Sequence, residues 1–245
     1  MSIPRFYIAP QHWQEDALVL DEDESHHCLE VLRLQEGNQI RAFNGQGVEV
    51  LAEISHARKR SVSLKTISVS TSAPPPARIS LGQSVPKGKN MELIIEKATE
   101  LGASEIFPLL TDRTVVRLDG EEAKRKQEKW QRVAIEACKQ CGQNWLPQVR
   151  LPMNVDRFLA SQPTAELLLI AAIEDGARRL KEFLPDHTAR PSSAMVLVGP
   201  EGDFTPAELA AAKNYGFLPL TLGPIILRAE TAAIFSLSIL AHELS

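Results

Sequence analysis

The stretch MVLVGPEGDFTPAEL, residues 195–209, decides how the chain is organised. It begins as a short apolar strand, passes through Gly199-Pro200-Glu201-Gly202, and then opens a helix for which Thr205 and Glu208 form a capping box. A strand that leads through a tight turn into a helix is the unit from which parallel α/β sheets are built. Ligands of such sheets bind beyond the carboxyl ends of the strands, so this turn is a candidate binding loop.

The same alternation of strands and helices extends over residues 77–245. Capping residues mark two of the helices: Asn90 precedes one that Gly102 ends, and Asp119 with Glu122 begins another. The strands are continuous apolar runs, as in a sheet that is covered on both faces. We expect a parallel α/β domain with strands at 79–83, 105–110, 167–173, 194–199 and 217–222 and helices at 91–101, 120–142, 206–216 and 230–244.

Residues 1–70 have a different pattern, which predicts short β-strands. Asn44-Gly45 lies between two extended runs and predicts a hairpin, because such a turn needs positive φ angles. Short strands at this spacing are typical of a small barrel. The acidic start of residues 21–34 predicts one helix within this region. The Pro-rich residues 71–76 are expected to form a stiff linker.

The composition excludes several classes of protein. Of the 245 residues, 44% are hydrophobic, and no apolar run reaches the roughly 18 residues of a membrane span. The N-terminus lacks the apolar core of a signal peptide, so we expect a soluble, cytoplasmic protein with no membrane partner. Cys138 and Cys141 share one face of a helix, where packing is favoured over redox chemistry. A second pair of ligands is missing, so we expect no metal site.

The charge is unevenly distributed along the chain. The formal net charge is −4, yet residues 77–150 hold 13 Lys and Arg against 10 Asp and Glu. A local basic surface for nucleic acid is therefore compatible with an acidic chain. For the cluster KRKQEKWQR, residues 124–132, a solvated helix face is an equal alternative.

The late loops do not carry the usual phosphate-binding motifs. The chain contains neither GxxxxGK[ST] nor the dinucleotide fingerprint GxGxxG after a strand. Instead, a second turn at residues 222–227, LGPIIL, is apolar and leaves backbone N–H and C=O groups available. An apolar slot edged by such groups suits a purine ring. Each turn alone favours a structural interpretation, but together on neighbouring strands they predict a binding site.

Two late segments and four earlier ones resemble one known family. VLVGPEGDFTPAEL followed by LGPIILRAETAA is similar to the C-terminal signature of the 16S ribosomal RNA uracil-N3 methyltransferases, which belong to the SPOUT, or α/β-knot, class. The resemblance covers most of the chain. Supporting segments are PRFYI, HHCLEVLRLQEGNQIRAFNGQG, KGKNMELIIEKATELGASEIFPL and DRTVVRL.

The resemblance implies an architecture that composition does not show. Residues 1–70 would be a PUA-like RNA-binding β-barrel, and residues 77–245 would be a parallel-sheet SPOUT domain with a deep trefoil knot. The family binds S-adenosylmethionine in the knot, acts on 16S rRNA of the small ribosomal subunit, and works as a homodimer. The residues expected to hold the cofactor are Ala171, Ala172, Ile173, Gly199, Pro200, Glu201, Gly202, Leu222, Gly223, Ile226, Leu227, Arg228 and Thr231.

Methylation at uracil N3 requires loss of a proton and stabilisation of negative charge on the base. An arginine suits that task, because its charged fork matches planar oxygens. Arg228 is the first candidate and Arg113 the second, with a salt bridge from Arg228 to Glu230 or Glu201 as an equal alternative. Glu201 and Glu230 are candidate proton acceptors, although a loop-fixing role is favoured for both.

Basic residues outside the late loops are the candidate RNA contacts. They are expected to touch phosphates, which position RNA without reading its sequence. These residues are Arg5, Arg33, Arg41, Lys87 and Lys89.

The chain departs from the family pattern at three places. Gln143 replaces the usual Arg of a Glu-Gln-Ser/Cys-Gly-Arg run, Trp145 stands where a second basic residue is common, and Asp203 replaces a Gly. The alternatives to uracil-N3 methylation are a knot-fold methyltransferase acting on another rRNA or tRNA position and a non-catalytic RNA-binding assembly factor.

Overall fold

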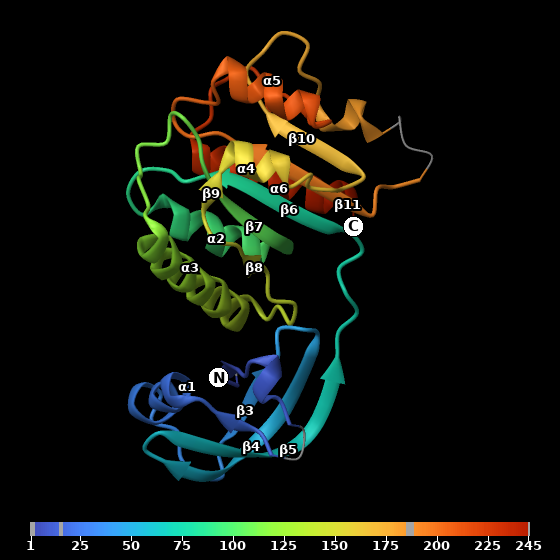
Figure 1. Cartoon of the computed structure of the whole chain (residues 1–245). Coiled ribbons are helices and arrows are strands. Elements are labelled where there is room, and N and C mark those ends of the chain that lie inside the picture. Colours follow the sequence, from blue (N-terminus) through green and yellow to red (C-terminus); the bar gives the residue numbers. More distant parts are fainter. Residues whose placement is uncertain (1–2, 15–16, 185–188, 245) are drawn as a thin grey trace. The chain divides into compact units, whose positions relative to one another are not determined.

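The computed structural model describes residues 3–14, 17–184 and 189–244, which fall into two compact units (Figure 1). The first unit consists of Met1–Pro74 together with Cys138–Leu146, and the second of Pro75–Ala137 and Pro147–Ser245. We expected residues 138–146 to belong to the second domain, whereas their contacts group them with the first unit.

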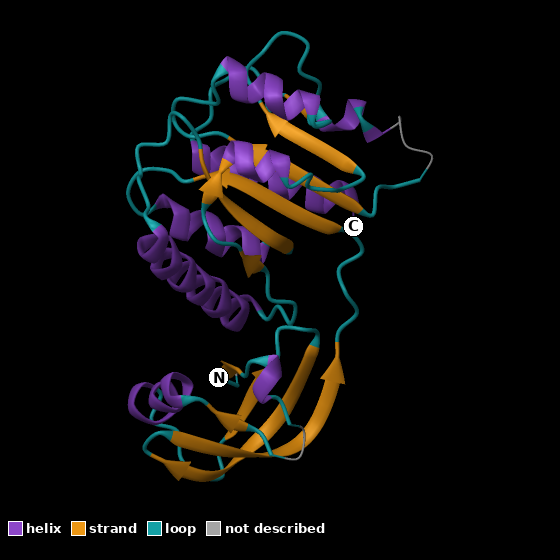
Figure 2. Ribbon diagram, viewed as in Figure 1, coloured by secondary structure: helices purple, strands orange, loops and turns teal. Residues whose placement is uncertain are grey.

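The first unit contains one five-stranded mixed sheet (Figure 2). β1 lies parallel to β3, and the other neighbours are antiparallel. The hairpin predicted at Asn44-Gly45 joins β3 to β4, with Phe43 opposite Glu49 and a φ of 73° at Gly45. The strands, in sheet order, are β1 (Arg5–Tyr7), β3 (Gln39–Phe43), β4 (Val48–Arg58), β5 (Ser61–Thr71) and β2 (Val19–Leu20).

The predicted helix at 21–34 forms in two parts. Asp21 caps α1 (Glu22–His26) by accepting a hydrogen bond from the backbone N–H of Glu24 at 2.8 Å. A π-helical turn, η2 (His27–Val31), continues it. A short 3₁₀ turn, η1 (Pro10–His12), lies earlier in the chain. The core of the unit is apolar, with Phe6, Ile40 and Val50 fully buried.

The segment after residue 141 completes the β3–β4 hairpin. The N–H of Leu146 donates to the carbonyl of Gly45, and the N–H of Gly47 donates to the carbonyl of Asn144, both at 3.0 Å. The Trp145 indole N–H donates to the carbonyl of Ala73 at 3.0 Å. A Cβ at Gly47 would lie 2.6 Å from the Trp145 ring, so the ring needs glycine beneath it. Trp145 therefore has a structural role in the first unit.

The second unit contains the predicted parallel sheet, which is confirmed. All its paired strands are parallel. The sequence missed β8 and β9, because two residues are too few to show a pattern. In sheet order the strands are β12 (Leu218–Leu220), β10 (Leu167–Ala171), β11 (Ser193–Val198), β6 (Arg78–Ser84), β7 (Ala103–Leu110) and β8 (Gln148–Val149), with β9 (Met153–Asn154) also beside β7.

Helices cover both faces of this sheet (Figure 1). α2 (Asn90–Glu100) and α6 (Ala229–Leu244) contact each other and the central strands on one face. On the other face, α4 (Val155–Ala160) and α5 (Pro206–Asn214) pack with apolar side chains of β7, β10 and β11. The remaining elements are α3 (Gly120–Cys141) and the 3₁₀ turn η3 (Leu180–Glu182).

Most of the predicted helix ends are confirmed. Asp119 accepts from the N–H of Glu122 at 2.8 Å, and Gly102 ends α2 with a φ of 77°. Thr205 and Glu208 form the capping box of α5. The expected cap at Asn90 is wrong by one residue, because the carbonyl of Lys89 already accepts from the N–H of Glu92 and Asn90 is the first helical residue.

Gly82 is expected to be essential for close packing in the middle of β6. A Cβ at this position would lie 2.3 Å from Cδ2 of Leu197 and 3.2 Å from Cδ1 of Leu109. Overpacking of this kind costs about 1–3 kcal/mol, so Gly82→Ala should lower the free energy of unfolding by that amount in a denaturant titration. Gly120→Ala is the control, because nothing lies within 4 Å of its Cβ position. Equal stability of the two variants would contradict this account of the β6–β11 packing.

Candidate functional site

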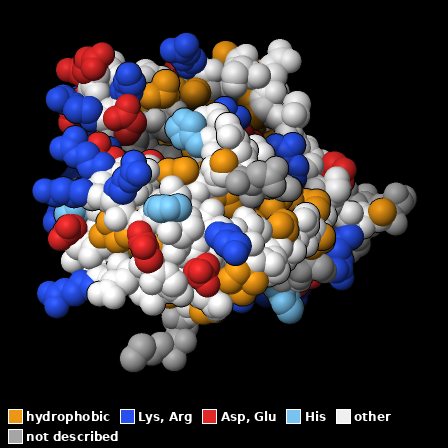
Figure 3. Space-filling view, turned by 90° about the horizontal axis from the view of Figure 1, so that it is seen from below, with side chains coloured by type: hydrophobic (Ala, Val, Ile, Leu, Met, Phe, Trp, Pro, Cys, Tyr) orange, Lys and Arg blue, Asp and Glu red, His pale blue; other side chains and the backbone are white. Residues whose placement is uncertain are grey.

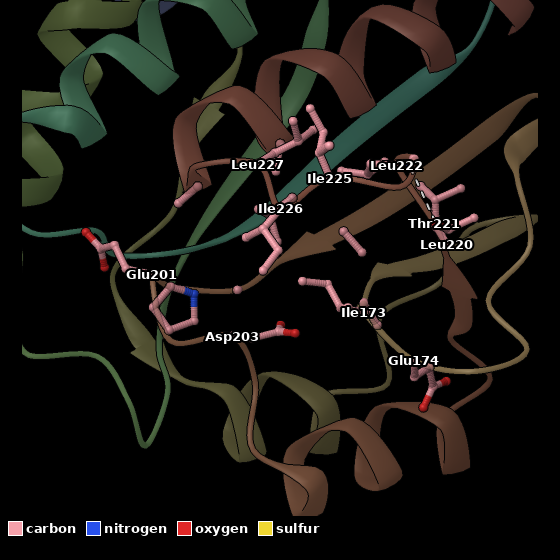
Figure 4. A pocket seen from close by; sticks show the side chains of 18 of the residues that line it. Ile173, Glu174, Glu201, Asp203, Leu220, Thr221, Leu222, Ile225, Ile226 and Leu227 are labelled. Atoms are coloured by element: carbon pink, nitrogen blue, oxygen red, sulfur yellow. Dashed lines mark hydrogen bonds between the residues drawn. The ribbon is translucent and has the colours of Figure 1, made fainter.

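A cavity of about 490 Å³ lies beyond the carboxyl ends of β10, β11 and β12 (Figure 4). Three loops line it, at residues 171–175, 198–203 and 220–227, together with Ala229 and Ala232 of α6. Cavities of this size hold small organic ligands. The three loops meet because their strands are neighbours that run in the same direction.

The turn at residues 199–204, called the GPEGDF turn below, is tightly folded. The N–H of Asp203 donates to the carbonyl of Pro200 at 2.9 Å. A Cβ at Gly199 would lie 3.0 Å from Oδ1 of Asp203 and 3.2 Å from the nitrogen of Phe204. A larger residue at position 199 would therefore push the turn open. The capping box of α5 fixes the residues that follow.

Two other loops hold the GPEGDF turn from outside. Glu201 accepts a hydrogen bond from the backbone N–H of Lys87 at 3.1 Å. The Arg113 guanidinium donates to the carbonyls of Gly202 and Phe204. Glu208, within the capping box, also accepts from the backbone N–H of Asp112 at 2.8 Å. Loops after β6 and β7 thus fix the wall of the cavity.

These contacts bear on the candidate catalytic residues. Glu201 and Arg113 both take part in fixing the turn, which is the alternative expected for Glu201. Arg228 is exposed, and within the described part of the chain its side chain pairs with neither Glu201 nor Glu230. The salt bridge offered as the alternative for Arg228 is therefore not formed. Glu230 is half-buried in the first turn of α6.

Ten of the thirteen residues expected to hold a cofactor come together in the cavity lining. Gly202, Arg228 and Thr231 are described residues that lie outside it. The ten are Ala171, Ala172, Ile173, Gly199, Pro200, Glu201, Leu222, Gly223, Ile226 and Leu227.

The sequence did not single out nine further lining residues. Most are immediate neighbours of predicted ones, so widening each loop by two residues would have found them. Asp203 could have been recognised from the sequence because it stands where the resembled family has a glycine. The nine are Glu174, Asp175, Val198, Asp203, Leu220, Thr221, Ile225, Ala229 and Ala232.

The cavity has an apolar rim that is open to solvent. Ile173, Ile225 and Ile226 are 70%, 71% and 83% exposed. They come from loops after β10 and β12 and lie around the same opening (Figure 4). Large apolar side chains gathered at a cavity indicate a binding surface.

The charged groups of the cavity are carboxylates. Those of Glu174, Asp175, Glu201 and Asp203 line it, and among the described lining residues there is no Lys, Arg or His. Lys213 neutralises Glu174, with 2.6 Å between Nζ and Oε1. The site therefore does not suit phosphate, which would require positive groups.

The structure separates the candidate RNA contacts into two groups. Arg5 and Arg41 both pair with the buried carboxylate of Glu49, which offsets one of their two positive charges inside the first unit. Arg33, Lys87 and Lys89 are exposed. One face of the molecule carries Lys and Arg interspersed with Asp, Glu and apolar side chains (Figure 3).

Two of the three cysteines have the environment of packed side chains. Cys28 and Cys138 are buried and Cys141 is exposed. Burial raises the pKa of Cys138 to about 12 and that of Cys28 to about 11, so both thiols stay protonated near neutral pH. Over the described ranges, no three His, Cys, Asp or Glu side chains group as metal ligands. Nor does any described helix have the length and apolarity to cross a membrane.

The second unit is a parallel sheet with a ligand-sized cavity at its carboxyl edge, and the first unit is a small mixed sheet. Together they define a two-unit α/β protein with a small-molecule site. Comparison with known families shows that the chain belongs to a family of RNA methyltransferases. The family model described as RNA methyltransferase domain matches residues 73–241, and the one described as RNA methyltransferase PUA domain matches residues 20–67. The resemblance seen in GPEG and ILRAETA is thereby confirmed.

Named relatives narrow the family further. Ribosomal RNA small subunit methyltransferase E of Bacillus subtilis is 32% identical over 225 residues, which are 90% of this chain and 88% of the relative. The protein of the same name from Synechocystis is 33% identical over 236 residues, 96% of this chain and 76% of the relative.

Solved structures share the fold over nearly the whole chain. A Legionella pneumophila methyltransferase, in complex with the bound cofactor SAM, has a TM-score of 0.89 and 34% identity, covering 99% of this chain and 98% of that one. Ribosomal RNA small subunit methyltransferase E from Neisseria gonorrhoeae, bound to S-adenosyl methionine, has a TM-score of 0.86 and 31% identity, covering 98% of both chains.

Arg113→Ala is expected to loosen the GPEGDF turn without unfolding the second unit. The guanidinium is exposed, so the lost hydrogen bonds should cost about 1 kcal/mol or less. In hydrogen exchange, the N–H of Asp203 should then exchange several-fold faster, while the β11 amides keep their protection. Arg117→Ala, at an exposed residue of the same loop, is the control. Unchanged exchange at residues 201–204 would show that Arg113 does not hold the turn.

Proposed function

We propose that this chain methylates N3 of a uridine in 16S rRNA of the small ribosomal subunit, with S-adenosylmethionine as methyl donor. The observation that carries the proposal is the cavity formed by the GPEGDF turn and residues 220–227. It lies in a chain that is similar, over 98–99% of its length, to two methyltransferases whose structures were solved with this cofactor.

The lining of the cavity fits this cofactor. Leu222, Leu227 and Ile226 supply apolar surface for an adenine ring. Backbone groups of residues 220–227 can read the edge of the ring, and carboxylates can bind ribose hydroxyls or cationic groups. A volume of about 490 Å³ accommodates a nucleoside with an amino-acid tail.

When bound, S-adenosylmethionine supplies a methyl group on a positively charged sulfur. The protein must then hold the uracil in line with that methyl and favour loss of the N3 proton. Alignment of two reactants can contribute about 7–11 kcal/mol to catalysis. Arg228 is exposed directly after the loop 220–227, where its charge can stabilise the uracil oxygens. Glu230 is the proton acceptor that we propose, since Glu201 holds the backbone of Lys87.

Recognition of RNA involves both units in this proposal. The match of residues 20–67 to a PUA domain of RNA methyltransferases supports RNA binding by the first unit. Arg33, Lys87 and Lys89 are exposed and are the phosphate contacts that we propose. Arg5 and Arg41 are assigned a weaker role, because both guanidiniums already pair with the carboxylate of Glu49.

The assembly state and the topology are proposed on the family resemblance. We propose a two-fold homodimer in the cytoplasm, with a knotted second domain. α6 is apolar on most sides and presents Phe235, which is 43% exposed. An exposed aromatic residue on such a helix supports burial against a second subunit.

Mapping of methyl groups tests the proposed reaction. Small-subunit rRNA from a strain that lacks this gene should lose one methyl group at a uracil N3, and the wild-type gene should restore it. Mass spectrometry of nuclease fragments locates the position. A methyl group lost from another base or from a ribose would contradict the uracil-N3 assignment.

Arg228→Ala is expected to lower turnover much more than cofactor affinity. Loss of a group that stabilises charge in the transition state costs about 10²–10³-fold in kcat. Calorimetry should show a cofactor Kd within about twofold of the wild type, because Arg228 lies outside the cavity lining. Arg228→Lys keeps the charge but not the planar fork, and should recover only part of the turnover. Equal losses of turnover and affinity would assign Arg228 to cofactor binding instead.

A further inference from the structure

Asp203 has an unusual backbone conformation for its residue type. Its φ is +61°, in the left-handed region that glycine adopts without cost. Only three described residues other than glycine have positive φ, and Asp203 is the one that lines the cavity. A glycine would form this turn more readily, so the shape of the turn does not explain why an aspartate stands at position 203.

The carboxylate of Asp203 faces the cavity. In Figure 4 it points inward from the GPEGDF turn toward Ile173 on the opposite wall. Oδ1 accepts a hydrogen bond from the N–H of Phe204 at 2.8 Å, which fixes the orientation of the side chain. The residue is half-buried, so the carboxylate is partly removed from water.

The carboxylate of Asp203 has no salt-bridge partner in the described chain. The nearby Arg113 guanidinium is bonded to the carbonyls of Gly202 and Phe204 instead. Glu174, in contrast, is paired with Lys213, and Glu201 is bonded to the backbone of Lys87. The described lining contributes no cationic side chain either. A partly desolvated carboxylate is stabilised when a positive group of a ligand approaches it.

We propose that Asp203 recognises a positive charge of the cofactor and is a specificity-determining residue of the site. This inference rests on the proposed use of S-adenosylmethionine. The cofactor offers two positive groups, the sulfonium and the α-ammonium. If Asp203 lies near the sulfonium, the site favours the charged cofactor over the neutral thioether left after transfer. If it lies near the ammonium, the site selects ligands that carry the amino-acid tail.

Asp203→Asn is the variant that separates charge from shape. Asparagine also tolerates positive φ, and its side-chain oxygen can still accept from the N–H of Phe204. The variant should therefore melt within a few degrees of the wild type. Asp203→Gly removes the side chain and keeps a permitted backbone, so it provides an independent second variant. Asp156→Asn removes an exposed carboxylate of α4 outside the cavity and controls for net charge.

Calorimetry with three ligands tests the proposal. The ligands are S-adenosylmethionine, S-adenosylhomocysteine, which keeps the ammonium but has a neutral sulfur, and 5′-methylthioadenosine, which has neither positive group. Asp203→Asn and Asp203→Gly should each weaken S-adenosylmethionine by about tenfold, as expected for a charge-assisted contact. Methylthioadenosine should bind within about twofold of the wild type. High salt should weaken the cofactor less in the variants than in the wild type.

The pattern across ligands locates the contact. An equal loss for S-adenosylmethionine and S-adenosylhomocysteine places Asp203 at the ammonium, and a loss for the cofactor alone places it at the sulfonium. The proposal is overturned if the variants leave cofactor affinity unchanged or weaken methylthioadenosine equally. Wild-type protein that does not bind S-adenosylmethionine would instead refute the proposed function, so the two failures are distinguishable.

Discussion

The binding site depends on the way the GPEGDF turn is fixed by loops that are far away in the sequence. Lys87 contributes a backbone N–H to Glu201, and Arg113 reaches the carbonyl of Gly202, 89 residues further along. These contacts are available because β6 lies between β7 and β11, so the loops after all three strands emerge at one edge. A turn with Gly at positions 199 and 202 has little preference for one shape by itself. Its neighbours supply that preference, and the cavity takes its form from them.

This arrangement determines which charged residues hold the structure together and which are available to a ligand. Glu201 and Arg113 appeared from the sequence to be candidates for chemistry, but both are engaged in holding the wall. Arg228 and Asp203 have no ion-pair partner within the described residues, which leaves their charge available to a ligand or substrate. In the first unit, Glu49 pairs with two arginines, and Lys139 pairs with the buried Glu24 at 3.0 Å. A count of basic residues is therefore a poor guide to the surface that RNA can use.

Local patterns in the sequence predicted most of the helices and strands, but they did not predict contacts between residues far apart in the chain. The Asn44-Gly45 hairpin and the Thr205–Glu208 box each depend on residues close in the chain, and both formed as expected. Neighbouring parallel strands place their loops together, which explains why most of the expected lining residues meet in one cavity. Periodicity contains no information on the pairing of Arg5 with Glu49 or of Trp145 with Ala73. Whether Arg228 pairs with a carboxylate is likewise decided by tertiary structure.

The pairing of residues 138–146 with the hairpin determines where the chain can be divided. A fragment that stops at Pro74 would contain all five strands of the first sheet. It would nevertheless lose the partners of Gly45 and Gly47, the indole over Gly47, and the lysine that neutralises Glu24. An autonomous version of this unit would need the nine-residue segment grafted back through a short artificial connection. The first unit is thus a discontinuous domain, built from two segments of the chain that the start of the second unit separates.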